Sequence, residues 1–292
     1  MSDMTMISPV ELIPAEQQRL WGWPAAANFA LGGLGAGFYV VAALASGLEP
    51  SPALTLATWL GPILVLAGFA AVAGEAGRPF RGPRVLFRVR TSWMSRELWI
   101  GGVFVLFAAA DVLFPLRLHR AQAVVAALLL AVAQGFILRR SRGVTAWDVS
   151  LMPWLFLASA LLSGGGLYLI VASALGHGPA AGLVAALLVL LAAGWALWSR
   201  YLTWSQAPAF VAVVKPLHEG VGGRSVVLAG YLAPFLLALS ALAVPWLAPP
   251  AFALAGALMV AGQFLAKTIL ILKAGQLRPI TLAGLALRRR SS

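Results

Sequence analysis

The feature that most constrains this chain is its succession of long apolar runs. A helix needs about 20 predominantly apolar residues to cross the hydrocarbon core of a bilayer. Eight runs of this kind follow one another, separated by short breaks rich in glycine, proline or charge; they cover residues 24–45, 53–74, 97–114, 121–138, 150–175, 180–199, 225–247 and 251–272. The pattern predicts an all-α integral membrane protein with eight transmembrane helices, arranged in two four-helix bundles.

Composition agrees with this interpretation and excludes a soluble domain. Of the 292 residues, 61% are hydrophobic and only 10% are charged, so a soluble domain could not cover its surface with polar groups. We expect a single transmembrane domain over residues 1–292, with a polar segment at 1–20 and the membrane region at 21–292. The connection at 200–224 reads as a long polar loop. A net charge of +12 is typical of basic cytoplasmic loops in a membrane protein, so we expect membrane lipids and no nucleic acid as partners.

The distribution of basic residues predicts the orientation. Eighteen of the 21 lysines and arginines lie on one side of the predicted spans, Arg117 and Arg120 lie on the other, and Lys267 lies within the last span. Basic residues accumulate in cytoplasmic loops. Both termini are therefore expected in the cytoplasm, in a multi-pass protein of the cell inner (cytoplasmic) membrane.

Residue types limit the cofactors that this chain can ligate. Cysteine is absent, so no iron–sulfur cluster with thiolate ligands is expected in this chain. The three histidines, His119, His177 and His218, all fall outside the predicted spans. Axial haem ligands in a helix bundle project into its interior, so we expect no haem, and we also expect no metal site.

Polar residues within the apolar runs indicate where a ligand could bind, because such residues are costly in lipid and tend to be functional. Asn28, Gln134, Gln263 and Lys267 all lie near the predicted cytoplasmic ends of their spans, whereas Asp111 lies near an outer end. A transporter would place polar groups or broken helices near the midplane. The observed layer favours a pocket at the cytoplasmic interface for an amphipathic ligand such as a quinone, whose reduction consumes two protons that a carboxyl group can carry.

The largest cluster of charge is the stretch from Gly74 to Trp99, with six arginines and two glutamates. Glu97 is expected in the first turn of the third span, where the helix dipole favours an anion. Alternative roles remain open. Glu75 and Glu97 could form interfacial salt bridges with the arginines, Asn28 could make only an interhelical hydrogen bond, and Lys267 could extend to the headgroups.

Two motifs resemble a known family. "WGWPAAANFALGGLGAG" at residues 21–37 and "GEAGRPFR…TSWMSRELW" within residues 74–99 resemble the membrane anchor subunits of the polysulfide reductase and dimethyl sulfoxide reductase families, the NrfD-like, PsrC-like and DmsC-like proteins. The stretch "WGWPAAANF" also resembles the anchors of phenylacetyl-CoA:acceptor oxidoreductases, which makes that subfamily the favoured one.

The resemblance implies a role in electron transfer. Such subunits anchor a molybdopterin catalytic subunit and a four-cluster iron–sulfur subunit, and they exchange electrons with a quinone, either menaquinone or ubiquinone. This chain would then be quinone-reactive but would not act on the main substrate. A secondary transporter and a purely structural anchor remain the alternatives.

The resemblance also suggests site residues. Glu97 and Glu75 are the candidates for proton transfer, although several relatives carry a histidine where Glu75 stands. The residues expected to surround the quinone are Trp21, Trp23, Asn28, Arg78, Arg81, Trp93, Arg96, Gln263 and Lys267.

Overall fold

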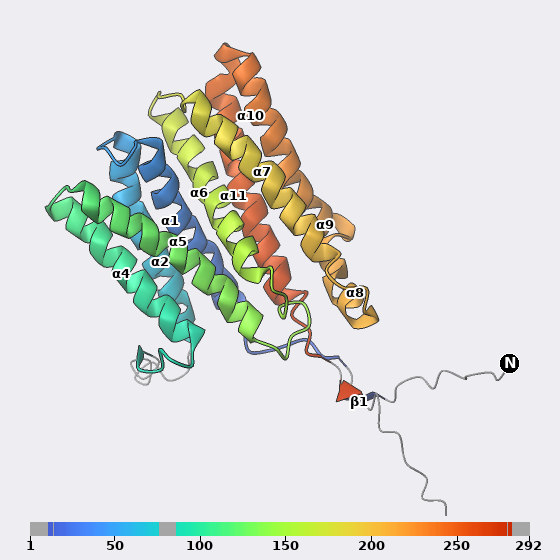
Figure 1. Cartoon of the computed structure of the whole chain (residues 1–292). Helices are drawn as coiled ribbons and strands as arrows, with labels where there is room; N and C mark the ends of the chain where they lie inside the picture. Colours follow the sequence, from blue (N-terminus) through green and yellow to red (C-terminus); the bar gives the residue numbers. More distant parts are fainter. Residues whose placement is uncertain (1–10, 14, 76–85, 279, 282–292) are drawn as a thin grey trace, which may run out of the picture.

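The structure is a computed structural model that describes residues 11–13, 15–75, 86–278 and 280–281. Long helices running side by side dominate it (Figure 1). In chain order, the long helices are α1 (Trp23–Ala45), α2 (Pro52–Glu75), α4 (Trp93–Leu113), α5 (Arg117–Arg140), α6 (Met152–Ala174), α7 (Ala181–Leu202), the continuous series α9 (Gly220–Val227), η3 (Leu228–Leu232) and α10 (Ala233–Ala243), and α11 (Ala248–Leu272). The short helical elements are α8 (Pro208–Val214), η2 (Lys215–Leu217) and η4 (Pro245–Leu247).

These helices make the chain an all-α multi-pass membrane protein. Within the described residues, seven helices are long and apolar enough to cross a membrane, as judged by length and composition. They coincide with seven of the predicted runs to within a few residues. Helix α4 is not among the seven, although it has 21 residues and covers most of the predicted run 97–114.

The start of α4 differs from the prediction. Ser92 is the N-cap, and its side chain accepts a hydrogen bond from the backbone nitrogen of Ser95 at 3.4 Å. The helix therefore begins at Trp93, four residues before the predicted boundary, because a serine at this position satisfies backbone donors of the first turn. Glu97 lies in the second turn and not in the first, so the expected stabilisation by the helix dipole is weaker than predicted.

Helix α1 occupies the centre of the arrangement and packs against α2, α5, α6 and α11. Its contact with α6 is close because glycines face each other. A Cβ atom on Gly37 would collide with the backbone oxygen of Ala160, and one on Gly164 would collide with the backbone of Gly37. Small residues at such a crossing let two helix backbones approach within a membrane.

Two apolar cores flank this contact. One is shared by α1, α2, α4 and α5 and includes Tyr39, whose ring packs edge-on against Phe104 with centroids 5.3 Å apart. The other gathers residues of α6, α7, α10 and α11 with those of α8, η2 and the α5–α6 connection. In Figure 1, α6 and α11 lie between the two outer groups of helices.

The connection at 200–224 is not the polar loop that we expected. It contains α8 and η2, and Phe210, Val213, Val214 and Leu217 are all buried. Apolar residues at these spacings form one face of a helical turn. The connection therefore packs an amphipathic face against the bundle, and its last residues already belong to α9.

Segments from both ends of the chain meet at one end of the bundle (Figure 1). β1 (Glu11–Ile13) pairs antiparallel with β2 (Ile280–Thr281), which adds a small sheet to the otherwise helical fold. The backbone of Gln18 donates to Gly275 at 2.8 Å, and that of Leu277 donates to Glu16 at 2.7 Å. The α5–α6 connection joins this layer, since the backbone nitrogen of Arg278 donates to the Gly143 oxygen at 2.7 Å.

Candidate functional site

A buried polar network joins α1, α4 and α5 near the end of the bundle where the two chain segments meet. Glu97 on α4 is only 4% exposed. Its Oε1 accepts a hydrogen bond from Nδ2 of Asn28 at 3.1 Å and one from Nε2 of Gln134 at 3.0 Å. The same Gln134 nitrogen lies 3.4 Å from the backbone oxygen of Asn28. The structure thus brings Asn28 and Glu97, two of the candidate residues, into one hydrogen-bonded network.

Glycines make room for this network. A Cβ atom on Gly32 would collide with Nε2 of Gln134, and one on Gly68 of α2 would lie 3.0 Å from Oδ1 of Asn28. The absence of side chains at these two positions therefore lets the amides of Asn28 and Gln134 fit between packed helices.

The network has unused acceptors. Within the described part of the chain, Oδ1 of Asn28 and Oε1 of Gln134 are buried and have no hydrogen-bond partner. Buried polar atoms are nearly always paired, so an unpaired one calls for a ligand, a water molecule or a functional explanation. A molecule that carries hydroxyl groups could donate to these oxygens beside the carboxyl group of Glu97.

Gln134 is not among the residues that we predicted to contact a quinone. One feature of the sequence could have identified Gln134 as a site residue. It is an amide within an apolar run, at the same predicted depth in the membrane as Asn28. The sequence did not reveal that its amide would face Glu97.

Lys267 of α11 lies on the side of α1 that faces away from Glu97. It is 4% exposed, its Nζ donates to the backbone oxygen of Phe29 at 2.9 Å, and it lies 5.6 Å from the ring centroid of Phe156. A Cβ atom on Gly33 would approach this nitrogen to 2.5 Å. Its ammonium group is therefore directed to the backbone of α1. The alternative that the sequence left open, in which the side chain extends to the lipid headgroups, does not hold.

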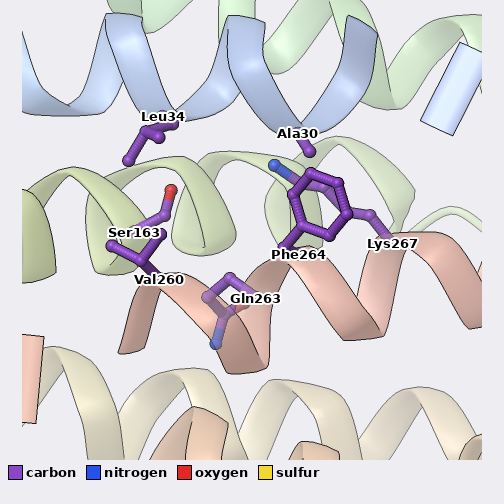
Figure 2. Close-up of a pocket in the computed structure, with 7 residues that line it drawn as sticks. All are labelled: Ala30, Leu34, Ser163, Val260, Gln263, Phe264 and Lys267. Atoms are coloured by element: carbon purple, nitrogen blue, oxygen red, sulfur yellow. The ribbon is translucent and has the colours of Figure 1, made fainter. Parts of the chain in front are cut away.

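A small pocket borders Lys267 (Figure 2). Its lining comes from α1, α6 and α11 and consists of Ala30, Leu34, Ser163, Val260, Gln263, Phe264 and Lys267. The amide of Gln263 does not face Lys267, because its Nε2 donates to the backbone oxygen of Gly230 in η3 at 3.3 Å. Gln263 and Lys267, both of which we expected around the quinone, thus direct their polar groups to different helices.

The aromatic and basic candidates near the helix starts have structural partners. Trp21 stacks on Trp147 with ring centroids 5.0 Å apart. Trp93 stacks on Phe136 at 4.2 Å, and the guanidinium of Arg96 lies 4.4 Å from the centroid of Trp93.

Arg96 also stabilises the turn that precedes α4. Its Nε donates to the Val89 oxygen at 2.8 Å, and its Nη2 donates to the Arg90 oxygen at 2.9 Å. Trp23, by contrast, is 62% exposed. The remaining candidates lie outside the description: Arg78 and Arg81 are not among the described residues, and of Glu75 only the backbone, at the end of α2, is described.

A second buried polar cluster lies at the opposite end of the bundle. Arg120 of α5 is 4% exposed and Asp111 of α4 is 7% exposed; Nε of Arg120 lies 2.9 Å from Oδ1 of Asp111. Nη1 of Arg120 also donates to the Leu48 oxygen at 2.8 Å. The sequence placed Asp111 near the outer end of its span and Arg120 on the side with few basic residues, but it did not predict that they pair.

Comparison with known proteins adds no identification, since no protein-family model matches the chain and no curated protein is significantly similar to it. A carboxyl group supported by two amide donors can hold or release a proton in the interior of the bundle, next to two acceptors that have no partner among the described residues.

Proposed function

We propose that this chain is the membrane anchor and quinone-reactive subunit of a molybdoenzyme complex, with Glu97 as its proton-transfer group. The observation that carries the proposal is the buried network in which Glu97 accepts hydrogen bonds from Asn28 and Gln134. Asn28 and Glu97 belong to the two motifs that resemble the NrfD-like and DmsC-like anchors. The burial of both side chains in one network supports that resemblance.

The chemistry of the network suits a quinone. Reduction of a quinone takes up two electrons and two protons, and oxidation of the quinol releases them. Oε1 of Glu97 already accepts two hydrogen bonds, so Glu97 would give or accept a proton at Oε2. The free oxygens of Asn28 and Gln134 would accept hydrogen bonds from quinol hydroxyl groups. The electrons would pass to or from an iron–sulfur subunit docked at this end of the bundle, which in turn serves a molybdopterin catalytic subunit.

We further propose that α4 is an eighth membrane span, so that the eight helices form two bundles of four. The pairing of segment 16–18 with segment 275–278 supports this count. Chain segments before the first span and after the last one meet on the same membrane face only if the number of crossings is even. The excess of basic residues favours the cytoplasm for that face, and a cytoplasmic substrate such as a coenzyme A thioester then becomes accessible to the partner subunits.

The decisive experiment compares Glu97→Gln with Glu49→Gln in the complex purified with its native partners. Glu49 is a matched control because it is exposed at the opposite end of the bundle and pairs with Arg117. We expect Glu97→Gln to slow quinone-linked electron transfer by about 10²-fold or more, while the complex still assembles and Glu49→Gln keeps the wild-type rate.

Two results would contradict the proposal. Wild-type rates in Glu97→Gln would rule out its proton-transfer role and favour a purely structural anchor. A purified complex that contains neither molybdenum nor iron would remove the assignment to a molybdoenzyme and revive the transporter alternative.

A further inference from the structure

The pocket at Lys267 is small, with a volume of about 10 Å³, and it adjoins a wider groove. A groove on the lateral surface is lined by Trp23, Ile170, Ala257, Val260, Ala261, Phe264, Leu265 and Thr268. Val260 and Phe264 line both the groove and the pocket. The two hollows are therefore neighbours, with these two side chains between them.

The groove has the dimensions and surface of a site for an apolar tail. Its α11 residues extend from Ala257 to Thr268, which corresponds to about 16 Å along the helix axis. Ala257 and Ala261 are exposed and lie one helical turn apart on α11. Their side chains are small, so they leave space for a ligand along this part of the helix. A chain lying there would run parallel to the helices, as lipid tails do.

The polar end of this system is Lys267. Its ammonium group has three donors, and the one partner found among the described residues is the backbone oxygen of Phe29. No acidic side chain of the described residues forms a salt bridge with it. A lysine buried within a membrane helix without a carboxylate marks a functional site by default.

The surroundings select the kind of headgroup. A phosphate would require several cationic donors, whereas this pocket offers one ammonium group. The hydroxyl of Ser163, which also lines the pocket, donates to the backbone of its own helix, at Ser159 and Ala160. Aromatic rings stand beside the nitrogen: Phe264 lines the pocket, and Phe156 lies 5.6 Å away. One donor among flat apolar groups suits a neutral ring that carries a carbonyl oxygen.

We propose that the α6–α11 face is a lateral quinone-binding site, in which Lys267 donates a hydrogen bond to a ring carbonyl and the isoprenoid tail lies in the groove between Trp23 and Ala257. This inference rests on the proposed reaction with quinones and adds a second position, separated from Glu97 by α1. The ring of Phe264, 39% exposed, stands between pocket and groove and must rotate to admit the headgroup.

The test is photolabelling of the full-length chain in lipid nanodiscs with an azido-quinone that carries an isoprenoid tail, followed by mapping of the labelled peptides. We expect label on α6 and α11 between residues 163–170 and 257–268, and we expect excess unlabelled quinone to suppress it. Lys267→Met and Ala261→Trp should each reduce this label by at least about tenfold, which corresponds to about 1.4 kcal/mol of binding free energy. Leu254→Trp is the matched control, because Leu254 is 52% exposed on α11 and does not line the groove.

The two proposals fail in different ways in this experiment. Undiminished labelling of α11 in both Lys267→Met and Ala261→Trp would overturn the lateral site. Label confined to the segments around Asn28 and Glu97 would overturn it as well, while leaving the quinone reaction of the chain intact. The absence of any label that excess quinone suppresses would overturn both. Ala261→Trp changes an exposed position, so it remains informative if Lys267→Met does not fold.

Discussion

The side-chain amide of Gln134 donates to Oε1 of Glu97 across 3.0 Å and thereby ties α5 to α4 inside the bundle. Both residues are almost fully buried. A buried carboxyl group with a missing donor is costly, whereas replacing both partners by apolar groups can be nearly neutral. The pair therefore contributes to folding as well as to the proposed chemistry, and the two contributions can be separated.

Gln134→Leu should destabilise the protein by about 1–3 kcal/mol, because it leaves Glu97 with the single amide donor of Asn28. The double variant Gln134→Leu/Glu97→Leu should regain only part of that loss, because it removes the buried carboxyl group but leaves the Asn28 amide without its acceptor. The measurement is the free energy of unfolding in mixed detergent micelles for a full double-mutant cycle. Additive effects, with no coupling between the two positions, would show that the hydrogen bond has little energetic weight.

The glycines of α1 should differ sharply in their tolerance of alanine. Gly37→Ala drives a Cβ atom into the Ala160 backbone, which cannot move aside, so we expect a loss of about 1–3 kcal/mol or failure to fold. Gly32→Ala displaces only the end of the Gln134 side chain, so the fold should survive while the proposed quinone reaction slows. Gly102→Ala on α4 faces open space and serves as control. Thermal unfolding of the three variants checks this order, and equal losses at Gly32 and Gly37 would contradict it.

The ion pair between Arg120 and Asp111 should be sensitive to the loss of one partner. Arg120→Met leaves a buried carboxylate without its cation, for which we expect a loss of about 3–5 kcal/mol; Arg120→Met/Asp111→Leu should recover most of it. The neighbouring pair of Arg117 and Glu49 is exposed, with a distance of 3.2 Å, so Arg117→Met should cost at most about 1 kcal/mol. Comparable losses in both single variants would show that burial does not distinguish the two pairs.

The sequence predicted the helices well because their signal is local. Twenty apolar residues bounded by Pro, Gly or charge define a membrane helix without knowledge of its neighbours. The shift at the start of α4 came from a capping serine, and the missed helix α8 came from apolar residues hidden within a stretch that we interpreted by its charges. Both errors concern signals of one or two turns.

The site was harder to predict because it depends on how the helices rotate against one another. Asn28 and Glu97 were chosen from motifs, and the structure joins them. Three other features depend on how the helices are rotated and which helices touch. They are the hydrogen bond from Gln134 to Glu97, the different directions of the Gln263 and Lys267 side chains, and the ion pair between Asp111 and Arg120. A single sequence shows how residues are spaced along one helix. It does not show how far that helix is rotated about its own axis relative to the helices it packs against.

The last prediction concerns the membrane face on which the two chain segments meet. Arg278 pairs with Asp148 at 3.1 Å, and the backbone of segment 275–278 is bonded to segment 16–18 and to the α5–α6 connection. A reporter fused after Arg290 and one inserted near Arg84 should therefore both report the cytoplasm, given the basic bias of these loops. A reporter inserted after His177, between α6 and α7, should report the opposite face. Activity of the Arg84 and His177 reporters on the same side would contradict α4 as a membrane span, because α4, α5 and α6 lie between these two positions. An inverted pattern at all three positions would preserve the fold but place the partner subunits, and with them the substrate, outside the cytoplasm.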